Sequence, residues 1–361
     1  MREKENGCPV QKRYVVRVGK ASIVGRGRAG GANQDSVCAL SHSAGLIENA
    51  GIEAVLAVAD GMGGGYAGEK ASKKAVEMLI ALFWQGDYRT WAKENGLNPE
   101  EFLHILKERV REIHESIMSM GRSIGKVMGT TLSSLIVKDG RYYIVHCGDS
   151  RVYLVRSGEV KQLTRDHSVV QELVDSNIPL ERARAMAGDN LVTNILGATP
   201  GVEINVSSGP VYEDDWFVVS SDGFHGSIGR NIISKGDILW AIRKLREAQA
   251  ICDTLVEKAN RRDGSDNISV AIAHVATPSC VEVPDRTFSP GAPVKRKIDT
   301  RRVWLFLLML FFLGVVVWFL VVCFGSYAVP EGTGVKKKQG VVPSRESRGE
   351  RQPGTKGTSN R

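Results

Sequence analysis

Paired cysteines are missing from this sequence. Its six cysteines lie at positions 8, 38, 147, 252, 280 and 323, with no C-x-x-C pair and no grouping with histidines at zinc-finger spacing. This pattern gives no support to a zinc finger or to a disulfide framework. We therefore predict reduced, mostly buried thiols in a cytosolic compartment.

A basic excess is missing from most of the chain. The net charge of +8 comes from residues 281–361, which hold 14 Lys/Arg against 6 Asp/Glu, whereas residues 1–280 hold 34 of each. A domain that binds nucleic acid normally carries clustered basic residues on its folded surface. The balance over residues 1–280 therefore argues against nucleic acid as a partner.

An apolar leader is missing from the first 20 residues, so no signal peptide is predicted. The long apolar run comes late, at residues 303–324, and contains no charged side chain. At about 1.5 Å per residue it would span roughly 33 Å, close to the hydrocarbon thickness of a bilayer. We expect a transmembrane helix there. The alternative is a buried core helix, which would rarely be apolar on every face.

The charges beside this run predict its orientation. Residues 283–302 hold six Lys/Arg, and residues 325–343 hold three. The positive-inside rule then predicts a single-pass protein of the cell membrane with residues 1–302 in the cytoplasm. Residues 277–302 are expected to form a basic, proline-containing linker, and residues 325–361 a disordered basic tail.

Hydrophobic periodicity predicts both helices and strands before the linker. Apolar residues at helical spacing predict helices at 67–82 and 99–120 and helical segments near 167–187 and 236–260. The predicted strands cover residues 54–59, 130–137, 141–147, 151–155, 203–207, 216–220 and 268–275. Asp139-Gly140 predicts a hairpin between two of them. Strands joined as hairpins and helices in pairs predict an α+β fold of antiparallel sheets covered by helices, not a doubly wound parallel sheet.

Aspartates adjoin four of the apolar segments. Asp60, Asp149 and Asp222 follow predicted strands, Asp266 precedes the last one, and Asp35 ends the loop GRAGGANQD. Any one of them alone is typical of a turn. Gathered at one rim of a sheet, they would repel each other unless cations lay between them, and hard divalent cations prefer oxygen ligands. The pattern predicts a divalent metal site, with separate turn carboxylates as the alternative.

A set of short motifs connects these aspartates. In chain order the motifs are NQD (33–35), VADGMGG (58–64), GTTL (129–132), GDSRVY (148–153), LTRDHS (163–168), TNILG (193–197), SDGF (ending at 224) and DNISV (266–270). This ordered set resembles the PPM-type, or type 2C, metal-dependent protein serine/threonine phosphatases, and their bacterial members most. The resemblance covers about residues 14–276.

The resemblance implies a four-layer α-β-β-α sandwich and two ions, Mn²⁺ or Mg²⁺, between the sheets. It implies that Asp60 bridges the ions and Gly61 contributes its carbonyl. Asp222 and Asp266 would complete one ion's ligands, and Asp35 would reach the other. Asp149 matches the position of a third, weaker ion in bacterial members. The implied catalytic residues are Asp60, Asp222 and Asp266, which hold the ions that activate a water to attack the phosphorus.

The same resemblance implies phosphorylated proteins as partners, with a serine/threonine kinase as the counterpart, and a flap formed by residues 164–192. Family members usually carry a phosphate-binding arginine where this chain has Gly30, so Arg28 is the expected substitute, with Arg26 as the alternative. Met62 stands where some relatives have a general-acid histidine. These departures leave a second hypothesis open, a pseudophosphatase that binds phosphoproteins with little turnover.

Overall fold

The computed structural model describes residues 14–42, 51–63, 66–83, 98–188 and 191–276. All of them belong to the first of two compact units, Met1–Val283; the second is Pro284–Arg361. The predicted linker, transmembrane segment and tail therefore lie outside the described residues. Within the described ranges, no helix has both the length and the apolarity needed to cross a bilayer.

The described strands form two sheets in which every pairing is antiparallel. The first sheet has the order β1 (Val15–Ile23), β11 (Ile268–Ala276), β10 (Trp216–Ser220), β7 (Arg151–Arg156), β8 (Glu159–Gln162). The second has the order β2 (Asp35–Ser41), β3 (Ile52–Met62), β5 (Leu132–Lys138), β6 (Arg141–Cys147), β9 (Asn205–Pro210), and β4 (Gly129–Thr130) pairs with the end of β3. The antiparallel prediction is confirmed.

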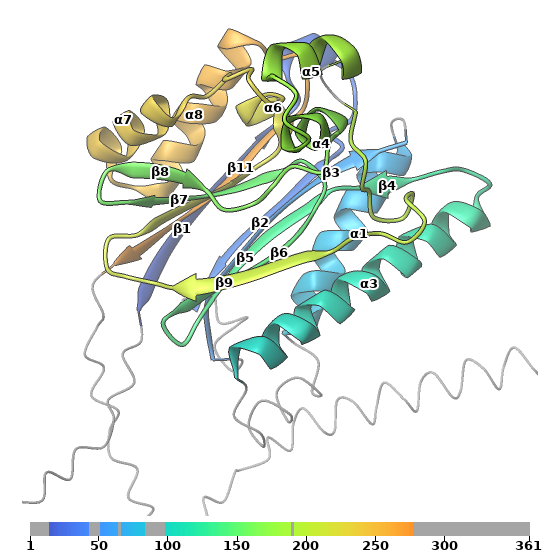
Figure 1. The fold of residues 1–361 in the computed structure, drawn as a ribbon. Helices are drawn as coiled ribbons and strands as arrows, with labels where there is room; N and C mark the ends of the chain where they lie inside the picture. The colour runs from blue at the N-terminus through green and yellow to red at the C-terminus, as the bar shows by residue number, and fades with distance from the viewer. Residues whose placement is uncertain (1–13, 43–50, 64–65, 84–97, 189–190, 277–361) are drawn as a thin grey trace, which may run out of the picture. The chain divides into compact units, whose positions relative to one another are not determined.

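The two sheets stack face to face with helices on both outer sides (Figure 1). Strand β3 is buried on both faces. Val55, Ala57 and Ala59 pack with the helices α1 (Tyr66–Leu82) and α3 (Pro99–Ser123). The alternate residues Ala54, Leu56 and Val58 pack against the other sheet. Because side chains alternate along a strand, a continuous apolar run marks a strand buried on both faces.

A second helix pair covers the outer face of the first sheet. Helices α7 (Lys235–Leu245) and α8 (Ala248–Arg262) pack on strands of that sheet through buried residues such as Ile238, Leu255 and Ile272. Together with the α1–α3 layer, this gives helix, sheet, sheet, helix, so the prediction of antiparallel sheets covered by helices is confirmed.

Several boundaries differ from the predictions. The helical segment predicted near 236–260 is two helices, because Arg246 is left-handed (φ 56°) and the Glu247 side chain caps α8. The segment near 167–187 is likewise split into α4 (Val169–Asp175) and α5 (Leu180–Ala187). Asp139 and Gly140 both have positive φ, as the predicted hairpin turn requires.

Two differences affect the aspartates directly. The expected loop ends earlier than predicted, since Asp35 is the first residue of β2, after the short 3₁₀ turn η1 (Arg26–Arg28). Asp60 does not end its strand, because β3 continues to Met62. Strands β1, β2 and β8, which sequence periodicity missed, carry mixed burial patterns without a clean alternation.

Candidate functional site

Two of the predicted aspartates face each other across a pair of strands. Asp35 and Asp60 are direct partners in the antiparallel register of β2 and β3. Direct partners in such a ladder have Cβ atoms about 5 Å apart on the same face. Thr131 holds the Asp60 backbone through two hydrogen bonds. Its Oγ1 accepts from the Asp60 N–H at 2.9 Å, and its own N–H donates to the Asp60 carbonyl at 2.8 Å.

Asp222 and Asp266 come from the other sheet. Asp222 opens the short helix α6 (Asp222–His225) directly after β10, and Asp266 precedes β11. The two backbones touch here, because a Cβ on Gly223 would lie 2.0 Å from the Asn267 carbonyl oxygen. Only glycine fits at such a distance, which explains the glycine after this aspartate.

A serine joins this pair to the first. Ser221 donates from Oγ to Asp35 Oδ2 at 2.8 Å, and it accepts from the Ser269 N–H at 3.0 Å. The contact bridges 186 positions in the sequence and connects the two sheets at their common rim. Ser221 lies within the SDGF motif, but no pattern in the sequence predicts this role for it.

Asp149 lies in the turn between β6 and β7, where Gly148 has φ 107°. Several bonds hold this turn. His167 Nδ1 accepts from the Gly148 N–H at 3.1 Å, and the His167 N–H donates to the Gly148 carbonyl at 2.8 Å. On the other side Ser133 Oγ donates to the Ser150 carbonyl at 2.6 Å. The turn that presents Asp149 is therefore clamped at both neighbours.

The electrostatics show that these carboxylates converge. Removal from water, together with the charge of nearby aspartates, raises the pKa of Asp35 to about 7 and that of Asp222 to about 6. The pKa of Asp60 is raised well above its ordinary value by the same burial and by all four other aspartates. Burial and Asp222 act in the same direction on the pKa of Asp149. The separate-turn alternative is therefore not supported.

The carboxylate oxygens of these aspartates are of the kind that divalent cations prefer as ligands. Among the described residues, Oδ1 of Asp35 and Oδ1 of Asp222 are buried oxygens that accept no hydrogen bond. Buried acceptors are normally satisfied, so these two oxygens are suited to a cation. No three His, Cys, Asp or Glu side chains in the described ranges are already closed around one point as a ligand set. The carboxylates would therefore have to reorient around an ion.

Gly61 lies in a second close approach of two backbone segments. A Cβ there would lie 2.1 Å from the Gly68 carbonyl oxygen and 2.6 Å from that of Gln34. Its N–H donates to the same Gln34 carbonyl at 3.1 Å. The strand carrying Asp60 can thus approach the start of α1 only because position 61 lacks a side chain.

Arg28 and Arg26 lie in different surroundings. Arg28 Nη2 donates to Asp266 Oδ2 at 3.2 Å, and Nη1 donates to Gln34 Oε1, also at 3.2 Å. Arg26 instead donates from Nε to the Asp263 carbonyl at 3.2 Å. The Arg28 side chain is 41% exposed. Arg28 is therefore the arginine beside the aspartate cluster, and its role in binding substrate stays a prediction.

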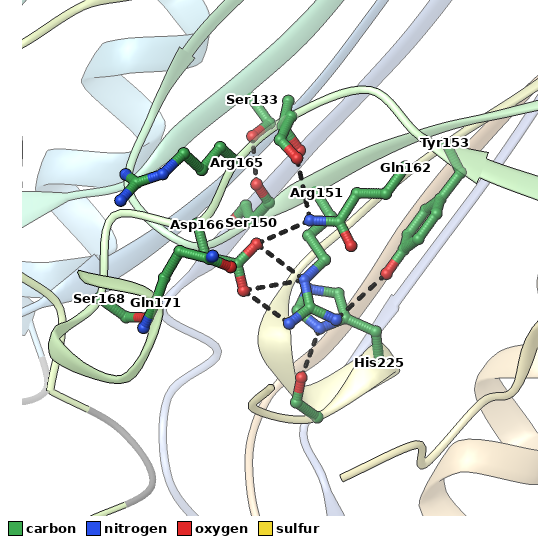
Figure 2. Close-up of polar contacts among 12 residues, drawn as sticks. Ser133, Ser150, Arg151, Tyr153, Gln162, Arg165, Asp166, Ser168, Gln171 and His225 are labelled. Atoms are coloured by element: carbon green, nitrogen blue, oxygen red, sulfur yellow. Dashed lines mark hydrogen bonds and ion pairs between the residues drawn. The ribbon is translucent and has the colours of Figure 1, made fainter. Parts of the chain in front are cut away.

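Figure 2 shows a buried ion pair between Arg151, two residues after Asp149 in the chain, and Asp166. Arg151 Nε and Nη2 donate to Asp166 Oδ1 and Oδ2 at 2.9 and 2.6 Å. Gln162 donates to the same carboxylate at 2.9 Å, and Arg151 Nη1 donates to the Tyr153 hydroxyl at 3.3 Å. Arg151 and Asp166 belong to the motifs GDSRVY and LTRDHS, but no pattern in the sequence predicts that they pair.

The histidines near the motifs are held by hydrogen bonds. His146 Nδ1 contacts Ser133 Oγ at 2.8 Å, and its Nε2 contacts the Arg165 carbonyl at 2.9 Å. Burial lowers the pKa of His146 to about 3. Burial also lowers the pKa of His167, whose ring contacts Asn194 at 2.9 Å. Both histidines fit the structural role that Ser133, Asn194 and the backbone give them.

The raised carboxyl pKa values predict how pH affects the metal-free protein. A carboxyl with a pKa of 3.8 when unfolded and about 7 when folded binds its proton more tightly in the native state. Its contribution to stability is complete below pH 3.8 and is lost as pH rises through about 7. We expect the melting temperature of EDTA-treated protein to fall between pH 5 and about 7.5, and to fall less with Mn²⁺.

Thermal unfolding with and without Mn²⁺ checks this expectation. Glu53 also has a pKa raised to about 7 by burial and by Asp139, but it contributes equally to both series. The difference between the series therefore isolates the aspartate cluster. Parallel pH profiles with and without Mn²⁺ would contradict the expectation.

Comparisons with known proteins agree with this geometry. The sequence profile described as Protein phosphatase 2C matches residues 25–254. Over 251 residues the chain is 32% identical to the serine/threonine phosphatase stp of Listeria welshimeri, covering 68% of this chain and 92% of the relative.

Solved structures show the same fold. The Mycobacterium tuberculosis serine/threonine phosphatase PstP/Ppp is 32% identical, with a TM-score of 0.59 over 73% of this chain and 99% of that one. The catalytic domain of PstP in complex with 2 manganese ions is 31% identical, with a TM-score of 0.58 over 73% of this chain and all of that one.

Proposed function

Because this chain belongs to the protein phosphatase 2C family, it is a protein serine/threonine phosphatase, and we propose that two divalent ions, Mn²⁺ or Mg²⁺, serve its reaction. The observation that carries the proposal is the convergence of five aspartates at one rim of the two sheets, four of them with raised pKa values. The similar catalytic domain of PstP, solved in complex with 2 manganese ions, supports it.

The proposed ligand roles follow from the position of each aspartate. Asp60 faces Asp35 across two strands and is affected electrostatically by every other member, which suits a bridging ligand. Asp222 and Asp266 come from the opposite sheet and would complete one ion's ligands. Bound divalent ions would activate a water as nucleophile and offset charge on the phosphoryl oxygens.

Other residues would prepare the site. Gly61 would contribute its carbonyl, and Asp149, in its clamped turn, would serve a third ion. Arg28 is paired with Asp266 at 3.1 Å and is long enough to exchange this partner for a substrate phosphate. A guanidinium matches phosphate geometry with two parallel N–H donors.

The direct test is hydrolysis of a phosphothreonine peptide by the full chain with Mn²⁺. We expect turnover that stops with EDTA and returns when Mn²⁺ is added in excess. Calorimetry on the same sample reports metal binding independently. Metal binding without turnover of any phosphopeptide would overturn the proposal and favour the pseudophosphatase hypothesis.

We also propose that residues 303–324 anchor the enzyme in the cell membrane as a single span, with the catalytic domain in the cytoplasm. The uncharged apolar run and the six Lys/Arg at 283–302 support this proposal. Anchoring would raise the effective concentration of the domain near phosphorylated membrane proteins, including a serine/threonine kinase.

Truncation after residue 280 tests the anchor. The full chain is expected in the membrane fraction after a carbonate wash, and the truncated chain in the supernatant. Activity of both on one phosphopeptide controls for folding. Recovery of the full chain in the washed supernatant would contradict the proposal.

A further inference from the structure

Exposed apolar side chains gather beside the candidate catalytic site. Nine large apolar side chains are exposed in the described residues, and four of them lie in two short segments. Those four are Met62 (38% exposed), Tyr66 (67%), Ile124 (48%) and Val127 (77%). The four residues are called the apolar rim below. Met62 ends β3, Tyr66 begins α1, and Ile124 and Val127 lie in the turn after α3.

The backbone segments that carry the apolar rim lie side by side. Met62 pairs in register with Gly129 of β4, two residues after Val127. A Cβ on Gly63, the residue after Met62, would lie 2.8 Å from the Val127 carbonyl oxygen and 3.6 Å from Ala67 Cβ. The start of α1, β4 and the loop after α3 lie at the same end of the helix layer (Figure 1). The end of β3 therefore touches both the start of α1 and the turn after α3.

The apolar rim and Asp60 share strand β3. Asp60 and Met62 are two residues apart on β3, so their side chains lie on the same face of the strand. Two residues of strand correspond to about 6.6 Å. A polypeptide whose phosphorylated side chain reaches Asp60 therefore has a neighbouring residue within reach of Met62.

The exposure of Val127 is fixed by its surroundings. The turn after α3 is closed by a bond from the Lys126 N–H to the Gly121 carbonyl at 3.0 Å. The next residue, Met128, is 1% exposed and is packed in the core between the helices and the sheet. With Met128 held inward and the turn closed, Val127 is held outward. A group of exposed apolar side chains on adjoining segments, unlike a single one, is typical of a binding surface.

Basic side chains border the rim. The Lys70 ammonium lies 4.1 Å from the centroid of the Tyr66 ring. Arg122 and Lys126 are exposed in the segment that carries Ile124 and Val127. These charges complement a phosphorylated chain, whereas they would repel one another across an interface between two copies of this surface.

We infer that the apolar rim docks the substrate polypeptide and selects phosphoproteins with an apolar side chain within about two residues of the phosphorylated serine or threonine. The inference rests on the proposed phosphatase function and names the substrate class of the same site. The basic border favours the phosphorylated chain as the occupant. Binding would cover Met62 and Val127 while the phosphate lies at Asp60.

The test uses the full chain with Mn²⁺ and two phosphothreonine peptides that differ only in leucine or serine two residues from the phosphothreonine. We expect kcat/KM to be roughly fivefold higher for the leucine peptide, mainly through KM, because one apolar side chain is partly removed from water. Val127→Ser is expected to bring the ratio close to one, and Val127→Leu to restore it. The ratio between peptides cancels general effects on the metal site.

Three controls separate the outcomes. Trp240→Ser removes another exposed apolar residue, 51% exposed on α7, and should keep the wild-type ratio. p-Nitrophenyl phosphate is too short to reach from the metal site to the rim, so its turnover reports the phosphatase function alone. If the protein hydrolysed it but cleaved both peptides at equal rates, the docking role of the rim would be overturned and the phosphatase function would stand. No turnover of any substrate would overturn the function itself. If Val127→Ser changed the sedimentation of the protein but not the peptide ratio, the rim would be a contact between copies.

Discussion

Replacing Asp60 by asparagine is expected to lower kcat/KM for a phosphothreonine peptide by roughly a thousandfold or more, about 4 kcal/mol of transition-state stabilisation. The physical reason is the central position of Asp60. It faces Asp35 directly, and its pKa is raised first by burial and then by the charges of the other four aspartates. In the proposed arrangement its charge serves both ions, so the neutral amide weakens both together.

The same change should have the opposite effect on the metal-free fold. Asp60 is a carboxylate removed from water among like charges, so asparagine removes a repulsion and should raise the melting temperature in EDTA. The stabilisation by added Mn²⁺ should largely disappear. Lower activity together with higher metal-free stability would distinguish a lost ligand from a damaged fold.

Asp253→Asn is the matched control, because Asp253 is exposed on α8 and accepts a hydrogen bond from Gln249 at 2.9 Å, away from the aspartate cluster. It should leave both activity and the Mn²⁺ effect unchanged. Arg28→Ala is a graded companion that should raise KM more than it lowers kcat. Wild-type kcat/KM in Asp60→Asn at saturating Mn²⁺ would refute the assignment of the site.

Local sequence was enough to find most of the acidic residues of this site. Asp60, Asp149 and Asp222 follow apolar runs beside glycines, and the structure gives two of those glycines a reason, since Gly61 and Gly223 sit where a Cβ would meet backbone at 2.1 and 2.0 Å. Asp35 was harder to place, because β2 has no clean alternation and was predicted as a loop. Its position opposite Asp60 depends on strand register, which no local pattern reports.

The partners of these residues could not be predicted. Ser221 reaches Asp35 across 186 positions, and Arg28 reaches Asp266 across 238. Periodicity describes neighbours within a helix or strand and is silent on such contacts. The break at Arg246 was missed for a related reason: a left-handed arginine has no glycine or proline signal. The membrane segment at 303–324 remains a prediction from composition alone.

The second large effect is expected at the buried ion pair, and it concerns stability. Asp166→Asn should lower the free energy of unfolding by about 3–5 kcal/mol, because it leaves the Arg151 guanidinium buried without a countercharge. The side chains of Arg151 and Asp166 are only 9% and 3% exposed, so water cannot replace the lost partner. Urea unfolding in EDTA at unchanged m-value measures the loss.

The double change Arg151→Met/Asp166→Leu separates the pair from its surroundings. Removing both charges leaves no unpaired ion, so the double variant should be more stable than Asp166→Asn. It still loses the bonds to Gln162 and the Tyr153 hydroxyl, which cost about 1 kcal/mol each. A coupling energy of roughly 2 kcal/mol between the two positions is therefore expected.

Asp175→Asn is the matched control, since Arg165 and Asp175 form an ion pair in the same region with side chains 46% and 44% exposed. Water screens that pair, so its loss should cost less than about 1 kcal/mol.

The buried pair of Arg151 and Asp166 should also affect metal binding at Asp149. Arg151 lies two residues after Asp149, and Asp166 precedes His167, which holds Gly148 from both its ring and its backbone. Loss of the pair in Asp166→Asn should therefore weaken the binding of a third ion at Asp149 more than the binding of the two ions at Asp60. In a Mn²⁺ titration by calorimetry, the weakest binding step should disappear. A urea midpoint for Asp166→Asn equal to that of Asp175→Asn would show that the pair does not hold this turn.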